Sequence, residues 1–393
     1  MFTYLIYPIF ILISLLLPRN KKIWVFGCYD GYLDNTRYFF EFSSLKRKAN
    51  CFWLANTEAE AEIIRSLGFK AVVKTSIVGY WVSSRAYLTF VCTGFSDVNR
   101  VLSLTSKVIN FWHGTPIKKI FFDSDYDLYR FGKSRFLKFI ADLGLKFLVS
   151  RYAFYYASNE LERRLVCGAA HMNLEKSIAI GAPRFDVIRR NAEIVLMKEF
   201  RKKYSKIYLY APTWRESGRW GVGFNIDNET YQRLNATLVN ENSLLIVKNH
   251  PLSCADEMKN WGLRASQNIM YSTSLGFDDL NALYFYSDAL ITDVSSSMFD
   301  YLIFNKPIYL FMPDVGEYML GARGVYDYFI GILLRNAEKE WQGVVNIFSG
   351  KKRNGVEREL DAHCSLLNLP GSINECIYSD LMLRFYRSNN SLH

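Results

Sequence analysis

The chain has 393 residues, half of them hydrophobic, which suits two domains of about 150–200 residues, each with its own core. Aromatic residues make up 16%, a surplus that fits either a core or a membrane-interface surface. The net charge of +10 indicates an anionic partner: nucleic acid, phospholipid or a phosphorylated substrate. The seven cysteines include no CxxC pair and the five histidines show no metal-ligand spacing, which argues against a disulfide framework and a zinc site.

The N-terminal residues 1–17, MFTYLIYPIFILISLLL, are almost wholly apolar and are followed by the basic segment PRNKK. This length is at the short edge of a membrane-spanning helix. No basic region precedes the segment and no small-residue cleavage site follows it, so we expect an uncleaved membrane anchor or membrane-associated helix over residues 1–21. The basic residues after it would keep the remaining chain cytoplasmic. The alternative is a buried first helix of the globular domain.

Short apolar runs, rich in β-branched and aromatic residues, then recur between polar helical stretches. Continuous apolar runs at this spacing predict buried parallel strands joined by helices. We therefore expect two Rossmann-like domains facing a cleft, over residues 22–190 and 191–393, with the charged helical segment 190–205 leading into the second. The predicted strands lie within residues 22–28, 50–56, 70–76, 86–94, 107–114, 152–158, 176–184, 206–213, 243–251, 268–273, 288–296 and 306–313.

Residues 133–151, KSRFLKFIADLGLKFLVSR, have the pattern of an amphipathic helix. One interpretation is an ordinary helix packed on the domain, and the other is an interfacial helix lying on an anionic membrane. The expected apolar face consists of Phe136, Leu137, Ile140, Leu143, Phe147 and Leu148, opposite Arg135, Lys138, Asp142 and Lys146.

The stretch INFWHGTPIKK ends a predicted strand on His113. Gly114 and Thr115 then begin a tight turn, and Lys118 lies one turn further on, where it could face an anion. A neutral imidazole near its reference pKa is suited to take a proton from a hydroxyl. The alternative is a core histidine whose hydrogen bonds are satisfied within the fold.

Two strand ends of the second half also carry polar groups. In KNHP, Lys248 and His250 share one face of an extended strand, an arrangement suited to phosphate oxygens. In YAPTWRE, Thr213 and Arg215 follow a strand, and the guanidinium could hold a pyrophosphate. The alternatives are a lone loop histidine, and a surface arginine paired with Glu216.

The stretch TDVSSSMFD places Thr292 and Asp293 at a strand end and then three serines where a helix should begin. Hydroxyls and free N–H groups at a helix N-terminus form an anion site, whereas the alternative is simple helix capping. In GAPRFD, Arg184 and Asp186 could pair across a turn, which we interpret as structural, at the hinge between the halves.

Several familiar signatures are absent from the sequence: the phosphate-binding GxxxxGK[ST] loop, GxGxxG after the first strand, GxSxG, and a DxD pair at a strand end. Their absence favours phosphate chemistry that uses histidine, arginine, lysine and helix N-termini. We therefore predict neither a metal nor an organic cofactor.

In combination, these motifs resemble the CDP-glycerol glycerophosphotransferase family of teichoic acid primases and polymerases. The matching pieces occur in the family's order over residues 22–335: WVFG…DNTRYFFE, INFWHGTPIKK, GAPRFD, YAPTWR, KNHP, ITDVSSSMFDYLIFNKPIYLF and RGVYDY. Val294, Phe185 and Lys248 depart from the residues common in the family. The resemblance implies a GT-B-like fold, with an acceptor domain followed by a nucleotide-donor domain, and catalytic roles for His113 and His250. The implied phosphate-binding residues are Gly114, Thr115, Lys118, Thr213, Arg215, Lys248, Thr292, Asp293, Ser295, Ser296 and Asp300.

The expected reaction is transfer of an alditol phosphate, with glycerol phosphate favoured over ribitol phosphate, from a CDP-alditol to a hydroxyl. The acceptor would be a lipid-linked or polymeric glycan in teichoic acid or capsule-type synthesis at the cytoplasmic face of the cell membrane, with no nucleic acid involved. One alternative is a GT-B glycosyltransferase that uses a nucleotide sugar. Another is a non-enzymatic binding module for anionic polymers.

Overall fold

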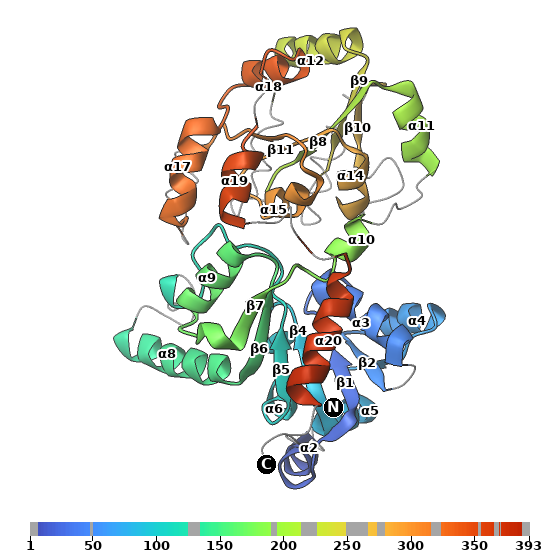
Figure 1. Cartoon of the computed structure of the whole chain (residues 1–393), viewed down its shortest axis with the longest axis vertical. Helices are drawn as coiled ribbons and strands as arrows, with labels where there is room; N and C mark the ends of the chain where they lie inside the picture. The colour runs from blue at the N-terminus through green and yellow to red at the C-terminus, as the bar shows by residue number, and fades with distance from the viewer. Residues whose placement is uncertain are drawn as a thin grey trace. The chain divides into compact units, whose positions relative to one another are not determined.

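The computed structural model divides into two compact units (Figure 1). The first unit comprises residues 1–115, 120–186 and 368–393, and the second comprises residues 116–119 and 187–367. The structure describes residues 7–47, 50–124, 134–189, 195–213, 226–248, 266–272, 280–315, 324–352, 355–364, 369 and 371–386.

The first unit contains a parallel sheet of seven strands in the order β3-β2-β1-β4-β5-β6-β7. This is the strand order of a Rossmann fold, in which ligands bind outside the carboxyl ends where the order reverses, here between β1 and β4. The strands are β1 (Asn20–Phe26), β2 (Cys51–Ala55), β3 (Ala71–Val73), β4 (Ala86–Val91), β5 (Lys107–Asn110), β6 (Tyr152–Ala157) and β7 (Ser177–Ala179). The helices are α2 (Tyr7–Leu16), α3 (Asp34–Arg47), α4 (Glu58–Ser66), α5 (Ile77–Arg85), α6 (Arg100–Ser103), α8 (Arg135–Ser150), α9 (Glu160–Ala169) and α20 (Ile373–Phe385), with α10 (Phe185–Arg189) where the chain leaves this unit. Short 3₁₀ turns are η1 (Phe95–Asp97), η2 (Phe121–Asp123) and η3 (Leu174–Lys176).

The second unit repeats the pattern with five parallel strands in the order β10-β9-β8-β11-β12. Its order reverses between β8 and β11, which makes their carboxyl ends the expected ligand edge. The strands are β8 (Lys206–Ala211), β9 (Ser243–Val247), β10 (Ile269–Tyr271), β11 (Ala289–Thr292) and β12 (Ile308–Leu310). The helices are α11 (Val195–Lys203), α12 (Asn228–Asn240), α14 (Leu280–Tyr286), α15 (Ser297–Tyr301), α17 (Asp327–Asn336), α18 (Trp341–Phe348) and α19 (Glu357–Cys364), with the 3₁₀ turn η6 (Leu302–Phe304).

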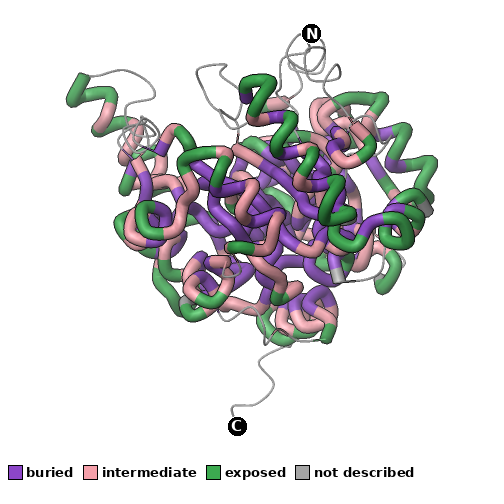
Figure 2. The backbone as a smooth tube through the Cα atoms, turned by 90° about the horizontal axis from the view of Figure 1, so that it is seen from above, coloured by how far each residue is buried: buried purple, intermediate pink, exposed green. Residues whose placement is uncertain are grey.

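The predicted α/β architecture with parallel sheets is confirmed, and each of the twelve apolar runs overlaps one strand. The runs succeed as predictors because central strands of such sheets are buried on both faces, so they need continuous apolar sequence. All five residues of β9 and all four of β11 are buried, as this argument requires. In Figure 2 the buried positions gather along the central strands, and the exposed positions lie on the outer helices.

Aromatic side chains fill much of the first core. Phe26 of β1 stacks on Phe90 of β4 with ring centroids 4.4 Å apart, and Phe90 stacks in turn on Phe111 at 5.7 Å. Trp24 packs against the same ring of Phe90 at 5.3 Å. Aromatic stacking adds about 0.5–1.5 kcal/mol per pair to the burial of the rings. A large part of the aromatic surplus therefore belongs to the core rather than to a membrane-facing surface.

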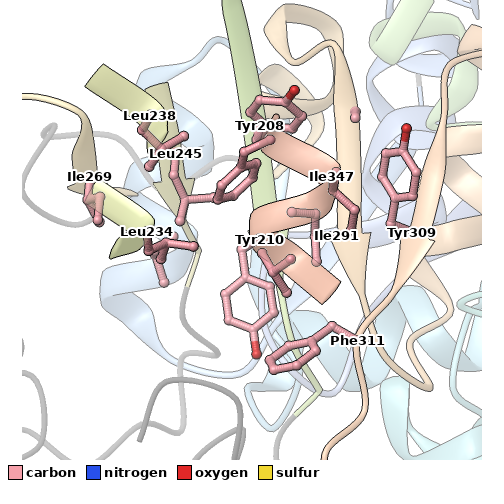
Figure 3. Packing of buried hydrophobic residues seen from close by; sticks show 14 of the residues in the cluster. Tyr208, Tyr210, Leu234, Leu238, Leu245, Ile269, Ile291, Tyr309, Phe311 and Ile347 are labelled. Carbon is pink, nitrogen blue, oxygen red and sulfur yellow. The ribbon is translucent and has the colours of Figure 1, made fainter. Parts of the chain in front are cut away.

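The second core lies where α12 and α18 cover one face of the five-stranded sheet (Figure 3). Tyr208 and Tyr210 point from alternate positions of β8 toward this face, since side chains two apart on a strand share a face. Leu234 and Leu238 of α12 and Ile347 of α18 close over them.

The C-terminal helix α20 belongs to the first unit, although the expected second domain ran to residue 393. The Trp24 indole donates a 2.6 Å hydrogen bond to the Tyr386 hydroxyl, which follows α20 directly, and Tyr378 packs against the indole at 5.9 Å. The carboxylate of Asp186 accepts the backbone N–H groups of Ile373 and Asn374 at 2.8 Å each. A carboxylate at this position caps the helix N-terminus and complements its dipole.

The N-terminal apolar segment forms the ten-residue helix α2, which packs one side against α5 and α6. Phe10 is buried, and its ring lies 5.7 Å from that of Tyr80 on α5. No helix in the described part of the chain is long and apolar enough to cross a bilayer. Residues 1–6 of the expected anchor lie outside the described part of the chain.

Candidate active site

The turn that carries His113 follows β5 at the carboxyl edge of the first sheet. Trp112 has a left-handed backbone, with φ of 52°, and Gly114 has φ of 147°, a conformation that favours glycine. Two asparagine side chains stabilise this path. The Asn110 Oδ1 accepts the Trp112 N–H at 2.8 Å, and the Asn35 amide donates to the Trp112 carbonyl at 2.8 Å. The unusual backbone is therefore over-determined by buried hydrogen bonds, as strained functional turns generally are.

The imidazole of His113 is exposed and stacks on the Trp112 ring at 4.7 Å. Its Nδ1 lies 3.3 Å from the backbone carbonyl of Cys92, in the loop after β4. A carbonyl can only accept, so this hydrogen bond requires the proton on Nδ1, and in the neutral imidazole the lone pair is then on Nε2. The geometry thus selects the tautomer that can accept a proton from a substrate hydroxyl.

The Cys92 carbonyl is held in place by Asp97, which is fully buried at the end of η1. Its carboxylate accepts the backbone N–H groups of Cys92, Thr93 and Gly94 at 2.7–3.2 Å, and that of Tyr29 at 2.9 Å. One carboxylate therefore joins the loops after β1 and β4 and positions the Cys92 carbonyl, which accepts the hydrogen bond from His113.

Asp97 also belongs to a buried group with Cys28 and Cys92, whose potential ligand atoms lie within 4.8 Å of one another. The hydrogen bond with Cys28, together with burial, raises the pKa of Cys92 well above its usual range. Metals bind the thiolate, which this environment disfavours. The oxygens of Asp97 are already engaged by N–H donors, so the group fits a structural hydrogen-bond network better than a metal site.

Thr115, predicted to bind phosphate, is buried, with 1% of its surface exposed. Its hydroxyl accepts the Asn159 amide at 2.7 Å and donates toward Glu162 at 3.4 Å. Burial raises the pKa of Glu162, while hydrogen bonds from Ser158 and Tyr155 and the charge of Arg184 oppose that rise. The hydroxyl of Thr115 is thus hydrogen-bonded to protein groups on both sides, and we assign it a structural role in the site.

Residues 116–119 of the same stretch belong to the second unit, where they pair with the segment around Val325. Lys118 forms an antiparallel bridge with Val325, and the Tyr326 N–H donates to the Ile117 carbonyl at 3.0 Å. The side chain of Lys118 is partly exposed. The predicted motif therefore divides, with His113 through Thr115 in the first unit and Lys118 in the second.

In the second unit, polar groups meet at the carboxyl ends of β9, β8 and β11. Asp293, after β11, accepts the backbone N–H and the hydroxyl of Thr213 at 2.8 and 2.6 Å. Thr292 donates its hydroxyl to the Ala211 carbonyl at 2.7 Å. Lys248 follows β9 and is 7% exposed, with its backbone N–H on β8. The sheet thus brings Lys248, Thr213 and Asp293 to one edge, as predicted from the strand ends.

The three serines after β11 are not equivalent. Ser297 is buried and donates its hydroxyl to that of Ser295 at 2.8 Å. Ser296 is exposed at the N-cap of α15 and makes no capping bond through its side chain. Asp300 lies in the first turn of this five-residue helix. The exposed hydroxyl of Ser296 is therefore not consumed by helix capping.

His250 and Arg215, two further predicted residues, lie outside the described part of the chain. Arg184 and Asp186, predicted to pair across the GAPRFD turn, have other partners in the structure. The Arg184 guanidinium pairs with Asp34 at 3.1 Å, in a largely buried position, and Asp186 caps α20.

Sequence reasoning missed Asn35, Asp97, Asn159 and Glu162, which act behind the turn rather than at its surface. Two signals were available. Asn35 lies in the DNT motif that begins α3, and Asn159 with Glu162 has the spacing of an N-cap and its third helical residue. Neither spacing says which distant residue the side chain will meet.

Each unit carries polar groups at the carboxyl edge of a Rossmann-ordered sheet: a histidine suited to act as a base in the first, and Lys248, Thr213 and Asp293 in the second. Such groups are typical of group-transfer enzymes of α/β type. Residues 9–348 match the family model described as CDP-glycerol:poly(glycerophosphate) glycerophosphotransferase. The chain belongs to this family, and it is accordingly a transferase.

The relatives agree with this assignment. The chain is 28% identical over 391 residues to the teichoic acid poly(glycerol phosphate) polymerase of Bacillus spizizenii, covering 92% of each protein. It is 26% identical over 337 residues to the teichoic acid glycerol-phosphate transferase of Staphylococcus aureus, covering 82% of this chain and 81% of that one. Its fold is similar to that of the wall teichoic acid polymerase TagF, in a histidine-to-asparagine variant soaked with CDPG. That similarity has a TM-score of 0.73 at 23% identity and covers 96% of this chain and 93% of the other.

Proposed function

We propose that this protein transfers glycerol phosphate from CDP-glycerol to a hydroxyl of a teichoic-acid-type glycan and releases CMP. The observation that carries the proposal is the orientation of His113. Its Nδ1 faces the Cys92 carbonyl, so Nε2 is left to accept a proton at an exposed position. The family assignment supplies the donor and the reaction type.

The reaction balances without a redox partner. The acceptor hydroxyl gives its proton to Nε2 of His113, and its oxygen forms a bond to the phosphorus that bears the glycerol. The bond from that phosphorus to the bridging oxygen of CMP breaks, and CMP leaves with the electron pair. Lys248 and the hydroxyl of Ser296 are the described groups that we assign to the nucleotide phosphates, together with the predicted His250 and Arg215.

The acceptor and the place of action are part of the proposal. We assign a lipid-linked or polymeric glycan as acceptor, because a protein with a net charge of +10 is attracted to anionic polymers and membranes. The exposed side of helix α8 is an argument that the enzyme acts at a membrane surface. Phe136, Phe139, Ile140 and Phe147 are between 49% and 69% exposed, so this apolar stripe does not pack on its own unit. The inner side of the helix, by contrast, contacts the core through Leu145, Leu148 and Val149.

Helix α2 adds a second exposed apolar surface, with Leu12, Leu15 and Leu16 between 57% and 77% exposed. The exposed residues Lys21 and Lys22 follow it. Apolar side chains next to basic ones are the composition of helices that lie in a membrane interface. We therefore place the enzyme at the cytoplasmic face of the cell membrane, attached peripherally through these two helices.

The test compares His113→Asn with His171→Asn, because both histidines are exposed and the second lies outside the site. The first substitution should lower CMP release from CDP-glycerol by about 10²–10⁴-fold, the usual contribution of a general base, while CDP binding by calorimetry stays intact. His171→Asn should be nearly neutral, since asparagine tolerates the left-handed backbone at that position.

A donor panel of CDP-glycerol, CDP-ribitol and UDP-sugars decides the substrate class. Release of UDP without CMP would assign a glycosyltransferase and overturn the proposal. Mass spectrometry of the product then separates a single added glycerol phosphate from a polymer. Near-normal activity of the His113→Asn variant on CDP-glycerol would remove His113 as the base.

A further inference from the structure

The turn carrying His113 is anchored on its downstream side by a buried polar cluster, formed by Tyr155, Ser158, Asn159 and Glu162 around Thr115. The side chain of Glu162 is fully buried at the first turn of α9. Its hydrogen bond from Thr115 connects it to the turn two residues after His113. Nothing in the proposed reaction uses a carboxylate here, so its burial needs another explanation.

The hydrogen bonds in this cluster have a defined direction. The Asn159 amide donates one hydrogen to the Thr115 hydroxyl at 2.7 Å and the other to the Ser158 hydroxyl at 3.0 Å. Each hydroxyl has one hydrogen of its own, which is thereby turned toward Glu162. The Asn159 oxygen is occupied by the Glu162 N–H at 2.8 Å, so the orientation of its amide is fixed.

Glu162 accepts the three hydroxyl hydrogens of the cluster and the Ser158 N–H. One oxygen accepts the Tyr155 hydroxyl at 2.6 Å and the Ser158 N–H at 3.1 Å, and the other accepts the hydroxyls of Ser158 and Thr115. Four donors and no acceptor match an ionised carboxylate. A neutral amide of the same shape would point two hydrogens at hydroxyls that already have a donor on their other side.

We propose that Glu162 is a positioning residue for catalysis, which fixes Thr115 and through it the orientation of the His113 imidazole. The upstream side of the turn is held by Asn35 and Asn110, and the downstream side depends on this cluster. Gly114, between the two, has a left-handed φ of 147°. The inference rests on the proposed role of His113 as the base.

The functional test uses a double-mutant cycle with Glu162→Gln and Thr115→Val, with Thr115→Ser as the conservative variant. Glu162→Gln and Thr115→Val should each lower kcat for CMP release by about 10–100-fold, the effect of a misplacement on the order of 1 Å. The KM for CDP-glycerol should stay within about threefold of wild type, because the donor site is assigned elsewhere. The double variant should have a kcat no lower than that of the slower single variant. Thr115→Ser, which keeps the hydroxyl, should retain the kcat of the wild type.

The matched control is Glu160→Gln, since Glu160 lies two residues away on α9 and makes only partly exposed ion pairs with Arg163 and Arg164. It should leave kcat unchanged. Losses that multiply in the double variant would overturn the proposal, as would an equal effect of Glu160→Gln.

A second readout does not depend on the reaction. With ring-labelled histidine, the five histidines can be followed by NMR, and the His113 signal is identified by its loss in His113→Asn. Glu162→Gln and Thr115→Val should shift or broaden that signal in the folded protein, whereas Glu160→Gln and Thr115→Ser should not. A His113 signal unchanged by Glu162→Gln would reject the positioning role even if the enzyme is active. If wild type releases no CMP from CDP-glycerol, the proposed function fails, and the NMR comparison still decides the role of Glu162.

Discussion

The proton-accepting form of His113 depends on a backbone carbonyl that a single carboxylate places. Asp97 holds the loop after β4 through three consecutive N–H groups, and the Cys92 carbonyl in that loop fixes Nδ1 of His113. Backbone donors constrain the loop more tightly than side-chain contacts do, because they leave few torsions free. The tautomer of the base is thus set two contacts away from the substrate.

Asp97→Asn should therefore affect both stability and rate. The new amide presents N–H groups to donors, and a buried mismatch of this kind costs about 2–3 kcal/mol of unfolding free energy. The loss is measurable by urea denaturation. The rate of CMP release per folded molecule should also fall, because the Cys92 carbonyl shifts. Glu58→Gln, which breaks an exposed ion pair with Arg65, serves as control and should change the unfolding free energy by less than about 1 kcal/mol. Full activity of the Asp97→Asn variant would contradict this account.

Individual residues differ in how far sequence could predict them. The sequence could predict the positions of His113, Lys248 and Asp293, because a polar residue that ends an apolar strand must emerge at the carboxyl edge of the sheet. The sequence could not predict the roles of Glu162 and Asp97, because each lies in a helical turn, where charged residues normally face solvent. Their partners come from other strand ends, so only the folded chain reveals that they are buried.

Among the elements, helix α8 has two apolar sides in different surroundings. Its inner side joins the core of the first unit, and its outer stripe remains exposed. The sequence pattern predicted the helix and its apolar face, but periodicity alone cannot say whether a face meets protein or solvent. The strands were easier to predict, since burial on both faces leaves a sequence pattern that needs no partner to interpret.

The double substitution Phe139→Ser and Phe147→Ser tests the membrane role of α8. Each buried phenylalanine contributes about 1.5–3 kcal/mol of transfer free energy, so binding to anionic phospholipid vesicles should weaken by more than about 10-fold. Cosedimentation measures the binding. The fold should be unaffected, because both rings are more than half exposed.

The control for this experiment is Leu334→Ser on α17, which removes a comparably exposed apolar side chain from the second unit. It should bind vesicles as wild type does. If the α8 variant also binds as wild type does, its exposed stripe serves a purpose other than membrane contact.

For the whole molecule, the division into units follows contacts rather than sequence order. The strand pattern predicted two Rossmann-like sheets correctly, since each sheet is encoded by consecutive runs. The return of α20 to the first unit was not predicted, because its packing against Trp24 and its cap by Asp186 join residues more than 180 positions apart. No local pattern encodes such a long-range partner.

Asp186→Ala and Asp227→Ala should consequently affect different units. Asp186 caps α20 in the first unit, and Asp227 caps α12 in the second through the Thr230 N–H. Loss of the first cap should raise amide hydrogen exchange in α20 and β1 and leave β8 and β9 protected, as expected for cooperative local units. Loss of the second cap should raise exchange in α12 only. Equal effects of both variants on both sheets would show that the units unfold together.

The place of α20 in the chain also fixes an order of events during synthesis. A ribosome makes the seven strands of the first sheet early, but Tyr378 and Tyr386, which pack on Trp24, emerge only after the entire second unit has been translated. At about 5–20 residues per second, the indole side of β1 stays uncovered for roughly 10 seconds or more. During that interval the nascent first unit exposes aromatic surface of the kind that chaperones bind, and its completion waits until α20 has been translated.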